Sequence, residues 1–125
     1  MEKVLLVFLG GGLGAVARYG AGVGVGRLGW AGWPYATLGV NVVGGLLMGV
    51  LAGMLAYKGG GENWRLALGV GALGGFTTFS AFSLETALMI ERREILSAGA
   101  YVLISVALSI LALFVGLMLT RKVFS

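Results

Sequence analysis

The chain of 125 residues contains no cysteine, no histidine and no aspartate. It therefore forms no disulfide, has no thiolate or imidazole ligand for a metal ion, and lacks a histidine general base. Its acidic residues are five glutamates, Glu2, Glu62, Glu85, Glu91 and Glu94. Only Glu85 lies well inside an apolar stretch, so catalysis by two carboxylates has no pair to use. We expect neither an enzyme nor an organic cofactor.

Charge is scarce as well. Charged residues make up 11% of the chain, whereas soluble domains average about 25%. Hydrophobic residues reach 58%, and the mean hydropathy is +0.98. A soluble protein of this length could not cover its surface with so few charges, so the composition indicates a membrane protein. The net charge of +4 lies at the ends of apolar segments, which favours contact with lipid headgroups over nucleic acid.

Four apolar segments are long enough for helices that cross a bilayer, which takes about 20 residues each. They cover about residues 4–26, 35–57, 64–90 and 95–119. The first continues far beyond the apolar core of a signal peptide, so we expect no cleavable signal there. Tryptophan and tyrosine mark the segment ends, as in an aromatic belt. The sequence predicts one all-α domain over residues 1–125, a multi-pass protein of the cell (inner or plasma) membrane.

Basic residues are almost balanced between the two membrane faces. Four spans put both termini on one side, with Lys3, Lys58, Arg65, Arg121 and Lys122. The other side has Arg27, Arg92 and Arg93, and also Arg18 if it is counted. Because the distribution of Lys and Arg sets orientation, this chain has almost no preferred one. It could insert both ways and pair as an antiparallel dimer with dual topology.

Glycines recur four residues apart on three of the spans, as in Gly45, Gly49 and Gly53. Spacing of this kind lets helix backbones approach closely in lipid. The pattern leaves open which of these contacts lie within a subunit and which lie between subunits.

Polar side chains inside the spans also follow helical spacing. Hydroxyl or amide stripes occur on three helices: Thr37 and Asn41; Thr77, Ser80 and Ser83; Tyr101, Ser105 and Ser109. A phenylalanine row, Phe76, Phe79 and Phe82, adds an aromatic face to the third. Any single hydroxyl could simply bond to its own helix, and a row of phenylalanines could simply be packing. Aligned stripes on three helices instead favour a polar path, because polar groups in lipid tend to face a cavity or a partner.

The third span contains the stretch GGFTTFSAFSLET at residues 74–86. Paired glycines followed by paired threonines are unfavourable for a continuous helix, so we expect this helix to break near its middle. A break frees backbone carbonyls, which are good ligands for Na⁺. Phenyl rings carry positive potential at their edges, so these rings, together with hydroxyl and amide donors, could also face a small anion.

These residues resemble the Fluc (CrcB) family of fluoride channels. The resemblance rests on GGFTTFSAFSLE at residues 74–85, TLGVN at 37–41, GGGLGAVARY at 10–19, and the hydroxyl stripe of the last span, and it covers the whole chain. It implies an antiparallel homodimer of four-helix subunits with two fluoride pores, and passive export of fluoride that lowers its level in the cytoplasm. Its partners would be fluoride, the lipid bilayer and a second copy of the chain.

The resemblance also assigns roles to residues. Phe79 and Phe82 would meet the anion with their ring edges, and Asn41 would donate its amide nearby. The carbonyls of Gly74 and Thr77 from both subunits would hold a central structural Na⁺. Further candidates for the pore are Ser80, Ser83, Thr37, Tyr101, Ser105, Ser109, Arg18 at its entrance and Glu85 along the polar path.

Two other functions compete with a fluoride channel. A small multidrug exporter of dual topology would need an acid in the first span to capture a cation, and that span has Arg18 instead. An assembly subunit that transports nothing would use the glycines for packing alone. Fluoride flux, dye efflux coupled to protons, or neither, would distinguish the three.

Overall fold

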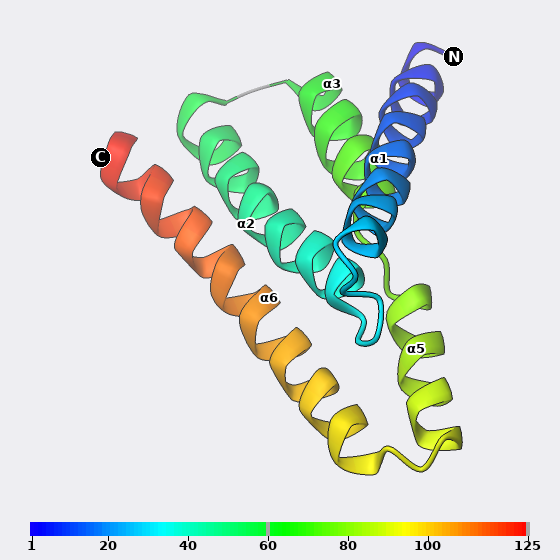
Figure 1. The fold of residues 1–125 in the computed structure, drawn as a ribbon. Helices are drawn as coiled ribbons and strands as arrows, with labels where there is room; N and C mark the ends of the chain where they lie inside the picture. Colours follow the sequence, from blue (N-terminus) through cyan, green and yellow to red (C-terminus); the bar gives the residue numbers. More distant parts are fainter. Residues whose placement is uncertain (60, 125) are drawn as a thin grey trace.

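The structure is a computed structural model and describes residues 1–59 and 61–124. All its regular elements are helical, and Figure 1 shows them in chain order. They are α1 (Glu2–Arg27), α2 (Tyr35–Lys58), α3 (Glu62–Trp64), the π-helix η1 (Arg65–Leu73), α4 (Gly74–Phe76), α5 (Ser80–Glu91) and α6 (Ile95–Phe124).

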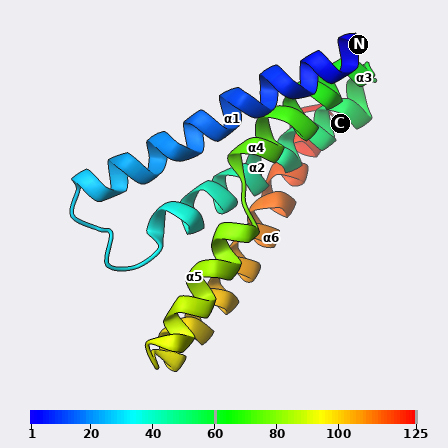
Figure 2. The ribbon, with the colours of Figure 1, turned by 90° about the vertical axis from the view of Figure 1, so that its right-hand side faces the viewer.

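Four helical segments are long and apolar enough to cross a membrane: α1, α2, the segment from Glu62 to Glu91, and α6. Each of the four predicted spans falls within one of them. Both termini and the start of α3 lie at one end of the molecule, and the connections from α1 to α2 and from α5 to α6 lie toward the other (Figures 1 and 2). The chain is a multi-pass membrane protein.

Glycines bring the helices into close contact within the subunit. A Cβ atom at Gly14 of α1 would overlap the carbonyl oxygen of Ala72 in η1, and one at Gly49 of α2 would overlap the carbonyl oxygen of Leu113 in α6. Neighbouring glycines of the same stripes show similar contacts. The spacing of four residues therefore serves two pairs of helices, α1 with η1 and α4, and α2 with α6.

The third segment changes its helical form along its length. Arg65–Leu73 is π-helical, a rare form that often occurs at functional sites. Gly74 and Gly75 remain helical, although glycine is a poor helix former, because Gly75 packs against the Gly11 carbonyl of α1. Residues 77–79 belong to no helix, and Thr77 has an extended backbone with φ −86° and ψ 160°. Figure 2 shows this connection between α4 and α5.

The turn after α5 closes with a non-glycine residue in the left-handed region. Arg93 has a φ of 63°, and its amide donates to the carbonyl of Ile90. The amide of Glu94 donates to the carbonyl of Met89. These two bonds form a Schellman motif, which satisfies carbonyls at the end of the helix and starts the tight turn into α6.

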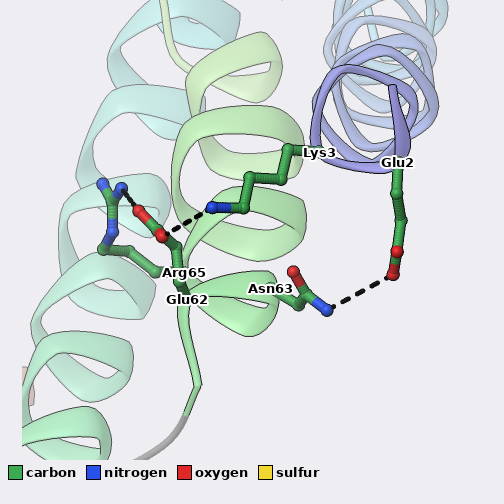
Figure 3. Close-up of polar contacts among 5 residues, drawn as sticks. All are labelled: Glu2, Lys3, Glu62, Asn63 and Arg65. Carbon is green, nitrogen blue, oxygen red and sulfur yellow. Dashed lines mark hydrogen bonds and ion pairs between the residues drawn. The ribbon is translucent and has the colours of Figure 1, made fainter.

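Polar side chains connect the start of α1 to the start of the third segment (Figure 3). Lys3 and Arg65 both contact Glu62, with N–O distances of 3.1 and 2.8 Å. Asn63 donates to Glu2 at 3.5 Å. All these groups are exposed, and solvent screens exposed ion pairs, so the cluster aligns two helix ends more than it stabilises the fold.

Candidate functional site

A pocket of about 430 Å³ opens between α2, α6 and the non-helical residues 77–79. Six of the residues that the sequence singled out line it together: Asn41, Thr77, Phe79, Phe82, Ser105 and Ser109. They come from three different spans, so the polar stripes and part of the aromatic row meet at one place. Apolar groups from α2 and α6 complete the walls, including Met48 and Leu113.

Asn41 holds the non-helical connection in place. Its Nδ2 donates to the carbonyl oxygen of Thr78 at 2.9 Å, and its Oδ1 accepts from the amide of Thr78 at 2.8 Å. Both backbone groups of a residue outside the helices are thereby satisfied at membrane depth, where an unpaired peptide group costs several kcal/mol. One of the two Nδ2 hydrogens is enough for this bond, so the amide keeps a second donor.

Three aromatic rings follow one another from this pocket toward the end of the molecule that carries the α5–α6 turn. The centroids of Phe79 and Phe82 are 5.4 Å apart, and those of Phe82 and Tyr101 are 5.2 Å apart. Phe82 is buried, but Phe79 is 77% exposed on this subunit. Phe79 thus lies at the open side of the pocket and Phe82 at its closed side.

Buried hydroxyls lie beside the inner rings. Tyr101 is fully buried and Ser105 is 5% exposed, and within the described part of the chain neither hydroxyl has a hydrogen-bond partner. Leaving such a group unpaired costs about 1–3 kcal/mol, so the Ser105 hydroxyl is open to a further partner, whereas Thr37 and Glu85 lie beside the Tyr101 hydroxyl. Nearby, Thr37 donates to a carboxylate oxygen of Glu85 at 2.6 Å. Four polar side chains from α2, α5 and α6 therefore accompany the rings.

Arg18 occupies a different position from the ring pocket. It lines a second pocket, of about 370 Å³, together with Thr37 and Thr78. Its Nε donates to the carbonyl oxygen of Gly75 at 3.2 Å. Arg18 therefore contacts the end of α4. Thr78 lines both pockets and so lies between Arg18 and Asn41.

Ser80 and Ser83 lie away from both pockets. Both are exposed on this subunit, and Ser83 donates to the carbonyl of Phe79 on its own helix at 2.9 Å. Ser80 lies 3.3 Å from the hydroxyl of Thr78. The spacing of three residues placed them on one face of α5, but that face points outward from the subunit.

The carbonyls of Gly74 and Thr77 are placed where the helical ladder stops. The amide of Thr78, which would bond Gly74 in a continuous helix, bonds Asn41 instead. Among residues 1–59 and 61–124, no backbone amide outside the helices donates to either carbonyl. Two hard oxygen donors within four residues suit a cation such as Na⁺.

Two residues were missed by reasoning from the sequence. Thr78 was noted only as a poor helix former, yet its backbone is the partner of Asn41. Trp33 was assigned to the aromatic belt, but its Nε1 donates to Ser97 at 2.9 Å and its ring meets that of Tyr101 edge-on. No local spacing connects these pairs, because each joins elements far apart in the chain.

The sequence matches the family model described as CrcB-like protein, Camphor Resistance (CrcB), over residues 5–117. The chain belongs to the CrcB family. Its similarity to that family was inferred from residues 10–19, 37–41 and 74–85, and the match confirms it. The family match includes most of each of the four spans and every residue of the site described above.

Similar CrcB proteins include chains from Phenylobacterium zucineum (61% identical), Caulobacter vibrioides (59%) and Hyphomonas neptunium (50%), each alignment covering the whole of both chains. All three are named fluoride-specific ion channel FluC. These relatives do not favour the multidrug exporter that the sequence left as an alternative.

Proposed function

We propose that this chain is a fluoride-selective channel that lets fluoride leave the cell passively through its cell membrane. The observation that carries the proposal is the pocket where phenyl rings and polar donors converge, with Phe82, Asn41 and the unpartnered hydroxyl of Ser105 around it. The names of the relatives, fluoride-specific ion channel FluC, support fluoride as the anion.

The chemistry of the pocket suits a small anion that must lose water. Phenyl edges offer a weak positive potential without a fixed charge, so they attract the anion without trapping it. Conduction needs binding that is favourable enough for the ion to enter and weak enough for it to leave. Hydroxyls of Ser109, Ser105 and Tyr101 then replace hydration along α6, and the path ends at Thr37 and Glu85.

The side chains exposed at the open side of the pocket favour a second copy of the chain that covers them. Phe79 is 77% exposed on this subunit, and Ser80 and Ser83 point outward beside it. An antiparallel homodimer covers these side chains and closes a pore on each side of the interface. The nearly equal counts of basic residues on the two membrane faces support dual topology.

A structural Na⁺ at the centre of this dimer fits the carbonyls of Gly74 and Thr77, given that the third span acts as a broken helix. When bound, Na⁺ supplies positive charge that compensates the exposed carbonyl oxygens of two subunits. Neighbouring backbone groups have hydrogen-bond partners of their own. Arg18 donates to the Gly75 carbonyl, and the Asn41 side chain bonds both backbone groups of Thr78. The Gly74 and Thr77 oxygens therefore stay available.

A passive channel suffices for export because HF crosses membranes as a neutral molecule and dissociates inside the cell. The trapped anion then leaves down its own gradient.

The test is fluoride efflux from liposomes that contain the purified protein, followed with a fluoride electrode. We expect flux that excludes chloride. Phe82→Ile removes the buried ring and its edge, so flux should fall to the leak of liposomes without protein, while size-exclusion chromatography shows an unchanged assembly. Absence of fluoride flux from the unsubstituted protein would refute the function, and unchanged flux in Phe82→Ile would refute only the role of the ring.

A further inference from the structure

A third pocket, of about 180 Å³, lies between the α1–α2 connection and the end of α5. Trp33 and Pro34 form one wall, Met89 lies on the opposite side, and Glu85 and Arg92 supply the charges. Water takes about 30 Å³ per molecule in the liquid, so this volume has room for a small anion with part of its hydration shell.

This pocket adjoins the polar path of the proposed pore. Glu85 lines the pocket and at the same time accepts the hydrogen bond from Thr37 at 2.6 Å. Trp33 forms another link, because it lines the pocket and its ring contacts that of Tyr101, with centroids 5.2 Å apart. The Thr37–Glu85 pair and the Tyr101 ring therefore lie next to the inner wall of this pocket.

Arg92 lies at the membrane-surface end of the same pocket. It is the residue that follows α5, and its side chain is 54% exposed. Its Nε and an Nη lie 3.3 and 3.4 Å from the carboxylate oxygens of Glu94, which partly compensates its charge. Glu91 and Arg93, its neighbours in sequence, do not line the pocket.

We propose that this pocket is an anion vestibule at the end of the polar path and that Arg92 concentrates fluoride there. The inference rests on the proposed function. It adds Arg92, a residue that lies outside the narrow part of the pore. Glu85 faces the same space with negative charge, so the anion is attracted at the mouth and is not held at the inner wall.

The physical basis is the attraction between one charge and an anion at a low-dielectric opening. Clefts lined by one sign of charge raise the local concentration of a counter-ion and its association rate about 10- to 1000-fold, with a steep fall as ionic strength rises. Arg92 is half exposed and paired with Glu94, and Glu85 brings the opposite charge into the same pocket, so the effect lies below this range. Attraction over more than about 8–10 Å is screened at physiological salt.

Arg92→Gln is the direct test, and Arg93→Gln is its matched control. Both remove one positive charge from the same turn, but only Arg92 lines the pocket, and glutamine at residue 93 keeps a non-glycine side chain at the left-handed position. Efflux is measured at low fluoride and fixed sodium, with potassium gluconate to vary ionic strength. We expect Arg92→Gln to lower the initial rate up to about tenfold at low salt. The difference from Arg93→Gln should shrink as salt is added, and Arg92→Lys should restore most of the rate.

Glu94→Gln gives a second test that keeps Arg92 in place. It releases the arginine from its carboxylate partner, so the rate at low salt should rise above that of the unsubstituted protein. Equal rates and equal salt dependence in Arg92→Gln and Arg93→Gln, or no rise in Glu94→Gln, would overturn the vestibule while the unsubstituted protein still conducts. If that protein does not conduct fluoride, the proposed function fails and this inference fails with it.

Discussion

Asn41 shows how one side chain can maintain an irregular backbone at membrane depth. A carboxamide has a donor and an acceptor arranged like those of a peptide group, so it can replace a neighbouring strand or turn for a single residue. Thr78 uses both groups, at 2.9 and 2.8 Å. The same side chain also lines the ring pocket. One amide therefore maintains the backbone and, in the proposed pore, would also offer a donor to the ion.

Asn41→Leu should remove both bonds and leave two peptide groups unpaired. Each unpaired group costs about 1–3 kcal/mol, so we expect the protein to lose about 2–6 kcal/mol of stability and all fluoride flux. Thermal unfolding in detergent and liposome efflux measure the two effects. Asn63→Leu is the control, since Asn63 is exposed and makes only one long bond, of 3.5 Å. Equal stability of the two variants would contradict the role assigned to Asn41.

Much of the site could be anticipated from single residues, and the limit is physical. An amide inside an apolar run must have a hydrogen-bond partner, because an unpaired polar group in the membrane is costly in free energy. Asn41 could be singled out on this ground alone. Which partner it has depends on how α2 and the third segment approach each other, and no pattern within either segment encodes that distance. For the same reason the outward position of Ser80 and Ser83 could not be distinguished from a place in the pocket.

At the scale of the element, the spans were predictable and their internal form was not. An apolar run of sufficient length defines a crossing whatever its helical hydrogen bonds are, so the four spans emerge from hydropathy. Hydropathy does not distinguish a π-helix from an α-helix, and η1 was therefore not foreseen. Paired glycines predicted a weak helix at residues 74 and 75, but packing against α1 overrides their low propensity, and the non-helical residues follow at 77–79.

Gly49→Ala tests whether close packing outweighs helix propensity. Alanine in a helix is favoured over glycine by about 1 kcal/mol, yet the added methyl group would overlap the Leu113 carbonyl of α6. Overpacking of this kind costs about 1–3 kcal/mol, so the net effect should be a lower melting temperature in detergent. Gly24→Ala is the comparison, because open space surrounds that position in the subunit. A stabilised Gly49→Ala would show that α2 and α6 can separate freely.

The whole molecule is a subunit whose apolar surface is largely uncovered. Its buried apolar core comprises Val40, Phe82, Met89, Ala98 and Tyr101. Leu13 and Leu103 are each 72% exposed, as expected for side chains that face lipid or a partner. Basic residues are nearly balanced between its two ends, which is the basis for the proposed dual topology.

Dual topology can be read from labelling, since the chain has no cysteine of its own. Leu28→Cys places a thiol after α1, where Leu28 is 62% exposed, and Asn63→Cys places one at the opposite end of the molecule. A membrane-impermeant maleimide applied to intact cells should label both variants to a similar, partial extent. With one fixed orientation, one variant would be labelled fully and the other would stay unlabelled.

The nine π-helical residues from Arg65 to Leu73 also determine the direction in which the chain emerges at Thr77. A π-helix winds more slowly than an α-helix, because its hydrogen bonds span five residues instead of four. Deleting or inserting a single residue there would shift the register of everything downstream and swing the Phe79 ring away from Asn41. This stretch should therefore tolerate no change in length, even though Leu73, at its end, is the one residue of it that lines the ring pocket.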